Sequence, residues 1–390
     1  MHLRLAAPIV FAASSLGIAA LTAAAPDPAP TITAPVTHEN LAVYLVRGRS
    51  AGGPAPATLE EALARGSVTV HETGNVRELK IENTGSEPVF IQFGDLVKGG
   101  RQDRVLTTSL LIPPRSGQIA IGAYCIEQGR WAKRGAEDAG KFSASNAQLF
   151  SRPAKVAIAR APLTTPEPRP AQGIMPPAEA RPAGARDVNQ APHIQARPAV
   201  EPPQQDAQRI LQGIEPRSPS GQGKVWESVS TAQLQLAARL AAPMASERSK
   251  TSLQLTLENE RLQKAQAAFV TALDAKALAD DDVIGVVVAI NGAITGGDLY
   301  PSNGLFRKMW PKLVRAAATE ALANPAKDMS APPSIADVEK FLAAAESGET
   351  STRALADIAE HETRESADAL KVEARTSDGR WIHRNFLAVK

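Results

Sequence analysis

One short block of this sequence, Gly94 to Trp131, gathers the residue types best suited to chemistry. A glycine pair precedes several arginines, and the chain's only cysteine precedes a glutamate. Paired glycines let a backbone approach a ligand and can direct N–H groups at an anion, whereas arginine forks bind phosphate and tryptophan stacks on flat rings. The predicted ligand-binding residues are Gly99, Gly100, Arg101, Gln102, Arg104, Glu127, Arg130 and Trp131.

Glu127 is the candidate catalytic residue, because a positioned carboxylate can act as a general base. Together the block suits a phosphorylated or nucleotide-like ligand. The alternative is a structural role, in which Arg104 pairs with Glu127 at a sheet edge. Cys125 would need a nearby base to become a nucleophile, and no histidine is close in sequence, which favours a buried, inert thiol. The histidine spacing lacks a zinc motif, and no P-loop or Rossmann fingerprint is present, so neither a metal nor a cofactor is expected.

Two predicted strands, Val105–Ile112 and Gln118–Ile126, position this block by pairing antiparallel around a Pro-Pro turn. In this register Arg104 lies opposite Glu127. Side chains alternate between the faces of a strand, and a slip of one residue would exchange the faces. The side chains predicted to share one face are Gln102, Arg104, Cys125 and Glu127.

The flanking sequence predicts an α+β fold, in which a β-rich half with antiparallel hairpins, residues 40–152, packs with a helical half, residues 223–390. A capping box predicts a helix over Thr58–Gly66. Turn residues at 83–86 predict a hairpin in the first half, and Asn291-Gly292 predicts another in the second. A further hairpin is expected at the C-terminal end.

Between these halves, residues 153–222 have a different composition. Roughly half of the chain's 30 prolines fall there, with no hydrophobic periodicity and almost no large apolar residue. Such a segment cannot bury enough surface to fold, so it is predicted to be a disordered insert that splits the domain.

Residues 1–24 have the features of a secretory signal peptide: a positive start, an alanine-rich apolar run and small residues before the expected cleavage point. Cleavage after Ala24 would leave residues 25–39 as a flexible N-terminus and an exported, periplasmic or secreted protein. The alternative is an uncleaved anchor. No later segment is long and apolar enough for a membrane span. The 43 basic and 41 acidic side chains nearly balance, which gives no electrostatic case for binding nucleic acid.

The sequence resembles a largely uncharacterised bacterial family named for its association with ADP-ribosylglycohydrolases and rhodanese-phosphatases. The most specific matches are GxRQxR, which begins at Gly99, and CxExGRW, which begins at Cys125. Supporting stretches include NLAVYLVRG, GKVWESVS, VIGVVVAINGAITGGDLYPSNGLFRKMW and GRWIHRNF. The resemblance implies one composite domain built across the insert, and a link to ADP-ribose or nucleotide-derived compounds. Family members usually carry lysine and asparagine where this chain has Arg101 and Asp103.

Three hypotheses follow. The first is an exported protein that binds a small phosphorylated or ADP-ribose-like anion at the glycine–arginine block. The second is a hydrolase that acts on such a compound through Glu127, with help from Asp298 or a histidine. The third is a structural or envelope-interaction module without a small-molecule site.

Overall fold

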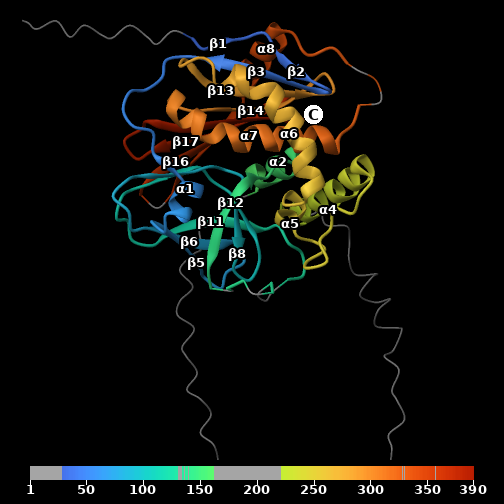
Figure 1. Cartoon of the computed structure of the whole chain (residues 1–390). Coiled ribbons are helices and arrows are strands. Elements are labelled where there is room, and N and C mark those ends of the chain that lie inside the picture. Colours follow the sequence, from blue (N-terminus) through green and yellow to red (C-terminus); the bar gives the residue numbers. More distant parts are fainter. Residues whose placement is uncertain are drawn as a thin grey trace, which may run out of the picture.

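The computed structural model describes residues 29–130, 134–135, 137–138, 140–161, 221–326, 328, 330–355 and 357–390. The predicted signal peptide, Trp131 and most of the predicted insert lie outside these residues. Within them the α+β prediction is confirmed, since mainly antiparallel sheets pack with helices that come mostly from the second half of the chain (Figure 1).

The largest element is a nine-stranded sheet that both halves of the chain build together. β3 (Leu41–Arg47) from the first half pairs antiparallel with β13 (Val283–Ile290) from the second. The predicted Asn291-Gly292 hairpin is confirmed, because it joins β13 to β14. Beyond β14, the sheet continues through the strands of the C-terminal region. The remaining strands are β1 (Thr31–Ile32), β2 (Val36–His38), β14 (Ala293–Leu299), β15 (Glu349–Leu355), β16 (Ala359–Glu365), β17 (Ala369–Thr376) and β18 (Trp381–Ala388). Of these, β17 and β18 form the predicted C-terminal hairpin.

Two smaller sheets come from the first half of the chain. The six-stranded sheet has the order β12 (Phe142–Gln148), β8 (Asp95–Gly99), β9 (Arg104–Leu106), β11 (Ile119–Cys125), β6 (Glu78–Asn83) and β5 (Val68–Glu72). The three-stranded sheet has the order β10 (Leu110–Ile112), β7 (Val89–Ile91) and β4 (Ala57–Thr58).

The hairpin predicted at residues 83–86 is wrong, because β6 and β7 belong to different sheets. The buried Asn83 side chain donates hydrogen bonds to the carbonyls of Glu87, at 2.8 Å, and Pro113, at 3.0 Å. These bonds tie the turn to a distant loop and direct β7 away from β6.

The single strand predicted over Val105–Ile112 is also wrong, since Thr107–Ser109 separates β9 from β10 and the two enter different sheets. β9 does pair with β11, but Cys125 lies opposite Arg104, two residues from the predicted register. A shift of two residues preserves the alternation of faces along the paired strands.

Seven helices are described for these residues: α1 (Leu59–Ala64), α2 (Arg152–Arg160), α4 (Gly221–Leu240), α5 (Leu253–Leu257), α6 (Glu260–Ala277), α7 (Asn303–Ala323) and α8 (Ile335–Glu346). The predicted capping box is confirmed, with Thr58 and Glu61 exchanging hydrogen bonds at the start of α1. None of the described helices combines the length and apolarity needed to cross a bilayer.

Two of the predicted boundaries need correction. Residues 25–39, expected to be flexible, contain β1 and β2, which pair with β3. The insert was expected to span residues 153–222. Its first residues belong to α2, which begins at Arg152, and its last two belong to α4, which begins at Gly221. Pro153 is compatible with α2 because it occupies the first turn, where a missing N–H costs nothing. α2 is only nine residues long and adjoins the proline-rich segment, so its residues were assigned to the insert by composition.

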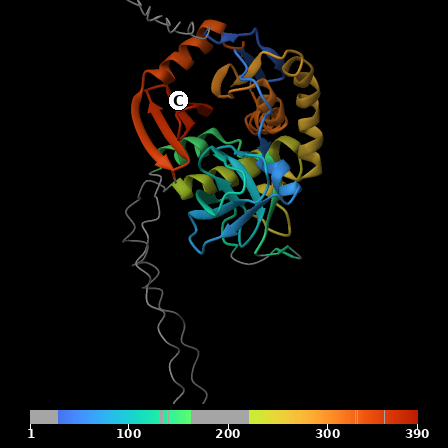
Figure 2. The same cartoon turned by 90° about the vertical axis from the view of Figure 1, so that its left-hand side faces the viewer.

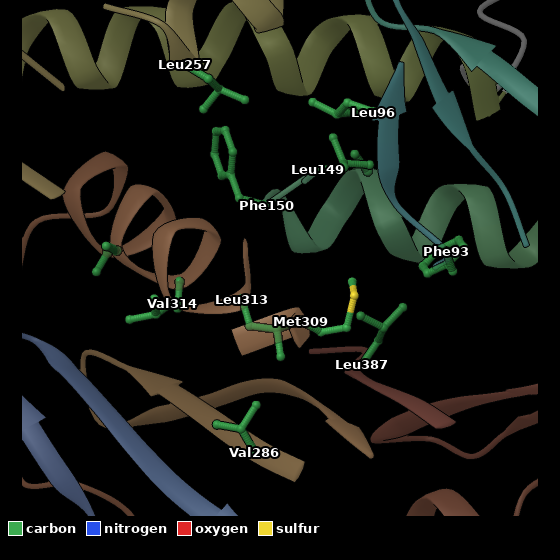
Figure 3. Packing of buried hydrophobic residues seen from close by; sticks show 14 of the residues in the cluster. Phe93, Leu96, Leu149, Phe150, Leu257, Val286, Met309, Leu313, Val314 and Leu387 are labelled. Atoms are coloured by element: carbon green, nitrogen blue, oxygen red, sulfur yellow. The ribbon is translucent and has the colours of Figure 1, made fainter. Parts of the chain in front are cut away.

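The two halves share one hydrophobic core. α7 lies across the main sheet, with the small sheets below it and α2 between them (Figures 1 and 2). Phe93 from the first half and Met309, Leu313 and Leu387 from the second half belong to the same buried cluster (Figure 3). Full burial of such a side chain stabilises a fold by about 1.5–3 kcal/mol. Because each half buries these side chains against the other, neither half has a complete core alone.

Candidate functional site

The glycine–arginine block is occupied by contacts within the protein. Gly99 and Gly100 have positive φ angles of 114° and 55°, as a sharp turn requires. Their N–H groups, however, donate to the Asp103 carboxylate at 2.9 Å and to the Lys141 carbonyl at 3.0 Å. The Arg101 side chain is exposed, while its backbone N–H donates to Glu72 at 3.1 Å. These N–H groups therefore do not form an open anion cradle.

Arg104 contacts two of the residues that were predicted to share its face, Gln102 and Cys125. Its guanidinium is buried, donates to Gln102 Oε1 at 3.1 Å and contacts the Cys125 sulfur. It also pairs with Glu72 at 3.5 Å. Burial raises the pKa of the Cys125 thiol more strongly than the charge of Arg104 lowers it, which agrees with an inert thiol.

The predicted Arg104–Glu127 pair is not formed. β11 ends at Cys125, so strand alternation does not extend to Glu127. The Glu127 carboxylate instead accepts hydrogen bonds from Arg130 at 2.5 Å and Arg134 at 3.4 Å.

Arg134 is the centre of a buried charged cluster. It binds Asp103 at 2.8 Å, and the side chains of Arg134, Asp103 and Glu127 are at most 1% exposed. Ser252, which precedes α5, donates to Asp103 at 3.0 Å, and Ser249 contacts Glu127. The cluster thus joins the first half of the chain to the loop before α5. The ligand-binding role of the glycine–arginine block stays a prediction.

A second polar cluster surrounds Asp298 on the inner face of the main sheet. Asp298 Oδ1 accepts hydrogen bonds from three side chains, Gln92 at 3.2 Å, His383 at 3.1 Å and Asn385 at 2.9 Å. His383 Nδ1 lies 2.9 Å from the Ser109 hydroxyl, which also accepts the backbone N–H of Phe93. Although burial acts in the opposite direction, the bond and charge from His383 hold the pKa of Asp298 below its usual value.

Strand pairing explains why these residues meet. Asp298 on β14 lies opposite Asn385 on β18, and His383, two residues earlier on β18, shares the same face. Gln92 and Ser109 reach this face from the loops that flank β7 and β10, which lie against the sheet.

A cavity of about 50 Å³ lies beside Asp298. We call it the Asp298 cavity. A buried water needs roughly 10–15 Å³, so the space suits about three or four waters or one small polar group. Apolar side chains of α7 and the main sheet form part of its wall. Its polar lining residues are Gln148, Arg152, Lys155, Thr295, Asp298, Glu320 and Asn385.

Several oxygen atoms of this lining have no hydrogen-bond donor among the described residues. They include the buried amide oxygens of Gln148 and Asn385. The orientation of each amide is fixed, because the Gln148 NH₂ donates to the Phe93 carbonyl and the Asn385 NH₂ to the Gly297 carbonyl. In the described part of the chain Asp298 Oδ2 also has no donor, because the three hydrogen bonds to that carboxylate go to Oδ1.

Lys155 supplies the charge of the cavity. It lies on α2, is only 9% exposed, and forms no hydrogen bond or ion pair through its ammonium with the described residues. Its charge acts on both Asp298 and Glu320. Glu320 Oε1 accepts the Arg152 N–H at 3.0 Å, yet burial outweighs that bond and the nearby charges and raises the pKa of Glu320.

A larger pocket of about 370 Å³, here the α6–α7 groove, adjoins the Asp298 cavity and shares Gln148 and Ala316 with it. Much of its lining consists of amide and hydroxyl side chains. These are Asn146, Gln148, Gln263, Gln266, Thr271 and Thr319. A metal centre is not indicated, since no group of three His, Cys, Asp or Glu side chains in the described part of the chain is arranged to hold an ion.

A model of the ARG and Rhodanese-Phosphatase-superfamily-associated Protein domain, ARPP-1, matches residues 30–165 and 170–387. The chain belongs to the ARPP-1 family. This confirms the resemblance drawn from the GxRQxR and CxExGRW motifs. The ARPP-1 match spans the charged cluster around Arg134 and the Asp298 cavity. No curated protein and no solved structure matched the chain.

Sequence reasoning named Asp298 and His383 only as possible helpers and missed Lys155, Glu320 and Gln92. One available signal was the strand WIHRNF, where His383 and Asn385 place polar groups two residues apart in an otherwise buried segment. Lys155 gave no such signal, because it was assigned to the insert. No sequence pattern near Glu320 indicates that it lines the same cavity as Asp298 in this ARPP-1 protein.

Proposed function

We propose that this ARPP-1 protein binds a small polyhydroxylated anion, of the ribose phosphate or nucleotide type, in the α6–α7 groove, with hydroxyl groups of its sugar entering the adjoining Asp298 cavity. The observation that carries the proposal is a combination of groups that have no partner among the described residues: the amide oxygens of Gln148 and Asn385, Oδ2 of Asp298 and the ammonium of Lys155. Sugar hydroxyls both donate and accept hydrogen bonds, so one ligand group satisfies both kinds of partner.

The α6–α7 groove supports a ligand larger than a sugar. Its volume of about 370 Å³ lies in the range of roughly 300–1,000 Å³ that is typical of small-molecule sites. Its amide and hydroxyl lining suits a base or a second sugar, and Arg315 offers a charge for phosphate. The family description names an association with ADP-ribosylglycohydrolases, which favours ADP-ribose among such compounds.

Replacing Lys155 with methionine is expected to weaken the binding of ADP-ribose by about 10- to 100-fold, the equivalent of a lost charged hydrogen bond. The unliganded variant should be as stable as the wild type or more stable, because an unpaired buried cation opposes folding. Isothermal titration with ADP-ribose, AMP, ribose 5-phosphate and inorganic phosphate, together with thermal unfolding, measures both effects. Lys224→Met is the matched control, because Lys224 is exposed on α4.

Failure of all four compounds to bind the wild type would contradict the proposal and favour a structural or envelope-interaction role. The glycine–arginine block is the alternative binding location, and its exposed side chain is Arg101. If Arg101→Ala abolished binding while Lys155→Met did not, the ligand site would lie at that block. Glu127 remains a weaker catalytic candidate than Asp298, because two arginines already neutralise it.

We further propose that the protein is exported. The support is the signal-like composition of residues 1–24, which lie outside the described part of the chain. N-terminal sequencing of protein from the periplasm or medium of its native host should give a start at Ala25. Recovery of a chain that retains residues 1–24 would contradict cleavage.

A further inference from the structure

We propose that Asp298 and Glu320 are the acid–base pair of a hydrolase that cleaves an O-glycosidic bond of a ribosyl compound bound at the Asp298 cavity. The proposal rests on the proposed binding function and adds a reaction to it. Both carboxyl groups line the same cavity but come from different elements. Asp298 lies on β14 of the main sheet, and Glu320 lies on α7, the helix across that sheet (Figure 1).

Each carboxyl group is held through one oxygen and leaves the other without a donor among the described residues. The three side chains on Asp298 Oδ1 fix its plane, and the Arg152 N–H fixes Glu320 Oε1. Catalytic groups need this combination of a fixed orientation and an atom open to the substrate. Glu127, by contrast, has both carboxylate oxygens occupied by hydrogen bonds from Arg130, Arg134 and Ser249.

The surroundings of the two groups assign them different roles. Asp298 is surrounded by donors that favour its ionised form, whereas burial favours the protonated form of Glu320. Two carboxyl groups in one site whose environments separate their protonation states are the arrangement by which hydrolases of glycosidic bonds obtain a base and an acid.

In the proposed step, water is the second substrate. Asp298 Oδ2 accepts a proton from that water as its oxygen forms a bond to the anomeric carbon. The bond between this carbon and the leaving oxygen breaks, and Glu320 transfers its proton to that oxygen. The products are free ribose with a new anomeric hydroxyl and the released alcohol. Proton exchange with solvent restores both carboxyl groups.

Lys155 and His383 are positioning residues in this scheme. Lys155 carries a positive charge close to both carboxyls and favours the negative charge on Asp298. His383, which is itself hydrogen-bonded to Ser109, contacts Asp298 Oδ1 and fixes the orientation of that carboxylate. Ser109 does not line the Asp298 cavity, and its hydroxyl already accepts the Phe93 N–H, so it is not the nucleophile.

Two synthetic probes separate the acid from the base. 4-Nitrophenyl riboside 5-phosphate has a leaving group that departs without a proton, whereas benzyl riboside 5-phosphate needs one; both anomers of each are tested. Asp298→Asn should lower kcat for both probes by about 10²- to 10⁴-fold. Glu320→Gln should lower kcat by a similar factor for the benzyl probe only. Glu227→Gln, at an exposed position of α4, is the matched control and should change neither rate.

Binding of each probe is measured beside turnover, so the two proposals fail in different ways. If the wild type binds the probes but hydrolyses none, the catalytic pair is wrong and the binding function stands. If no probe binds, the proposed function fails and the reaction with it. An equal loss on both probes in Glu320→Gln would overturn its role as the acid. Asp298 accepts three hydrogen bonds, so Asp298→Asn could disturb the fold. Its rates are used only if its thermal unfolding is cooperative. If it is not, the comparison of the two probes in Glu320→Gln decides whether the catalytic pair is correct.

Discussion

Replacing Arg134 with methionine is expected to lower the free energy of unfolding by about 3–5 kcal/mol, the range measured when one partner of a buried ion pair is removed. Arg134 holds both Asp103 and Glu127, and all three side chains are at most 1% exposed. Without the guanidinium, two buried carboxylates would face each other with only Arg130 between them. Urea unfolding followed by circular dichroism measures the change.

Arg101→Met is the matched control for this substitution. Arg101 belongs to the same block but its side chain is exposed, so a change within about 0.5 kcal/mol is expected. Adding Asp103→Asn to Arg134→Met should recover part of the loss, because it removes one of the unpaired charges. A loss below about 1 kcal/mol for Arg134→Met would show that water or relaxation compensates the cluster and would contradict its structural role.

Acidification from pH 7 to pH 4.5 is expected to lower the free energy of unfolding of the wild type by about 2.5 kcal/mol through the titration of His361 alone. His361 on β16 is 4% exposed, and neither of its ring nitrogens has a hydrogen-bond partner among the described residues. Burial, with a smaller contribution from the charge of His383, lowers the pKa of His361 from 6.5 to about 4. In this window the unfolded histidine binds a proton that the folded one excludes, so stability is present at neutral pH and is lost as the pH falls.

His361→Leu removes that difference, so its unfolding free energy should fall less than that of the wild type between the same two pH values. Other titrating groups contribute equally to both proteins and cancel in the comparison. His71→Leu is the control, because His71 is a partly exposed histidine paired with Glu82. Identical pH profiles for the wild type and His361→Leu would show that His361 is protonated in the folded protein near its ordinary pKa.

These results bear on what the family motifs do. Three of the charged residues that mark this chain as an ARPP-1 member, Arg104, Glu127 and Arg130, are used in contacts within the protein. The open polar groups lie instead at Asp298, Lys155 and Glu320. The stability of the Arg134 cluster and the binding at Lys155 are therefore separable by experiment.

The Asp298 cavity also depends on the core shared by the two halves. α2 brings Lys155 from the first half, and α7 brings Glu320 from the second. Both helices pack against the main sheet or its neighbours in the cluster that contains Phe93, Met309 and Leu387 (Figure 3). A change in that packing would displace the cavity walls without touching a polar residue.

The sequence by itself determined the features whose causes lie within a few residues. The capping box at Thr58, the Asn291-Gly292 turn and the C-terminal hairpin follow from local hydrogen bonds and backbone preferences, and all three are confirmed. The family also followed from short motifs. Sequence could determine the α+β class for the same reason, because class depends on which periodicities occur and not on which elements meet.

Only the tertiary structure decided which distant residues lie together. The pairing of β3 with β13 and the division of Val105–Ile112 between two sheets depend on the packing of the whole chain. So does the meeting of Lys155, Asp298 and Glu320, which lie on three elements far apart in sequence. The spacing of side chains along a strand or helix determines which face each one occupies. The residues that meet across a cavity are determined by how the two halves bury their apolar surface together, and no local pattern encodes that packing.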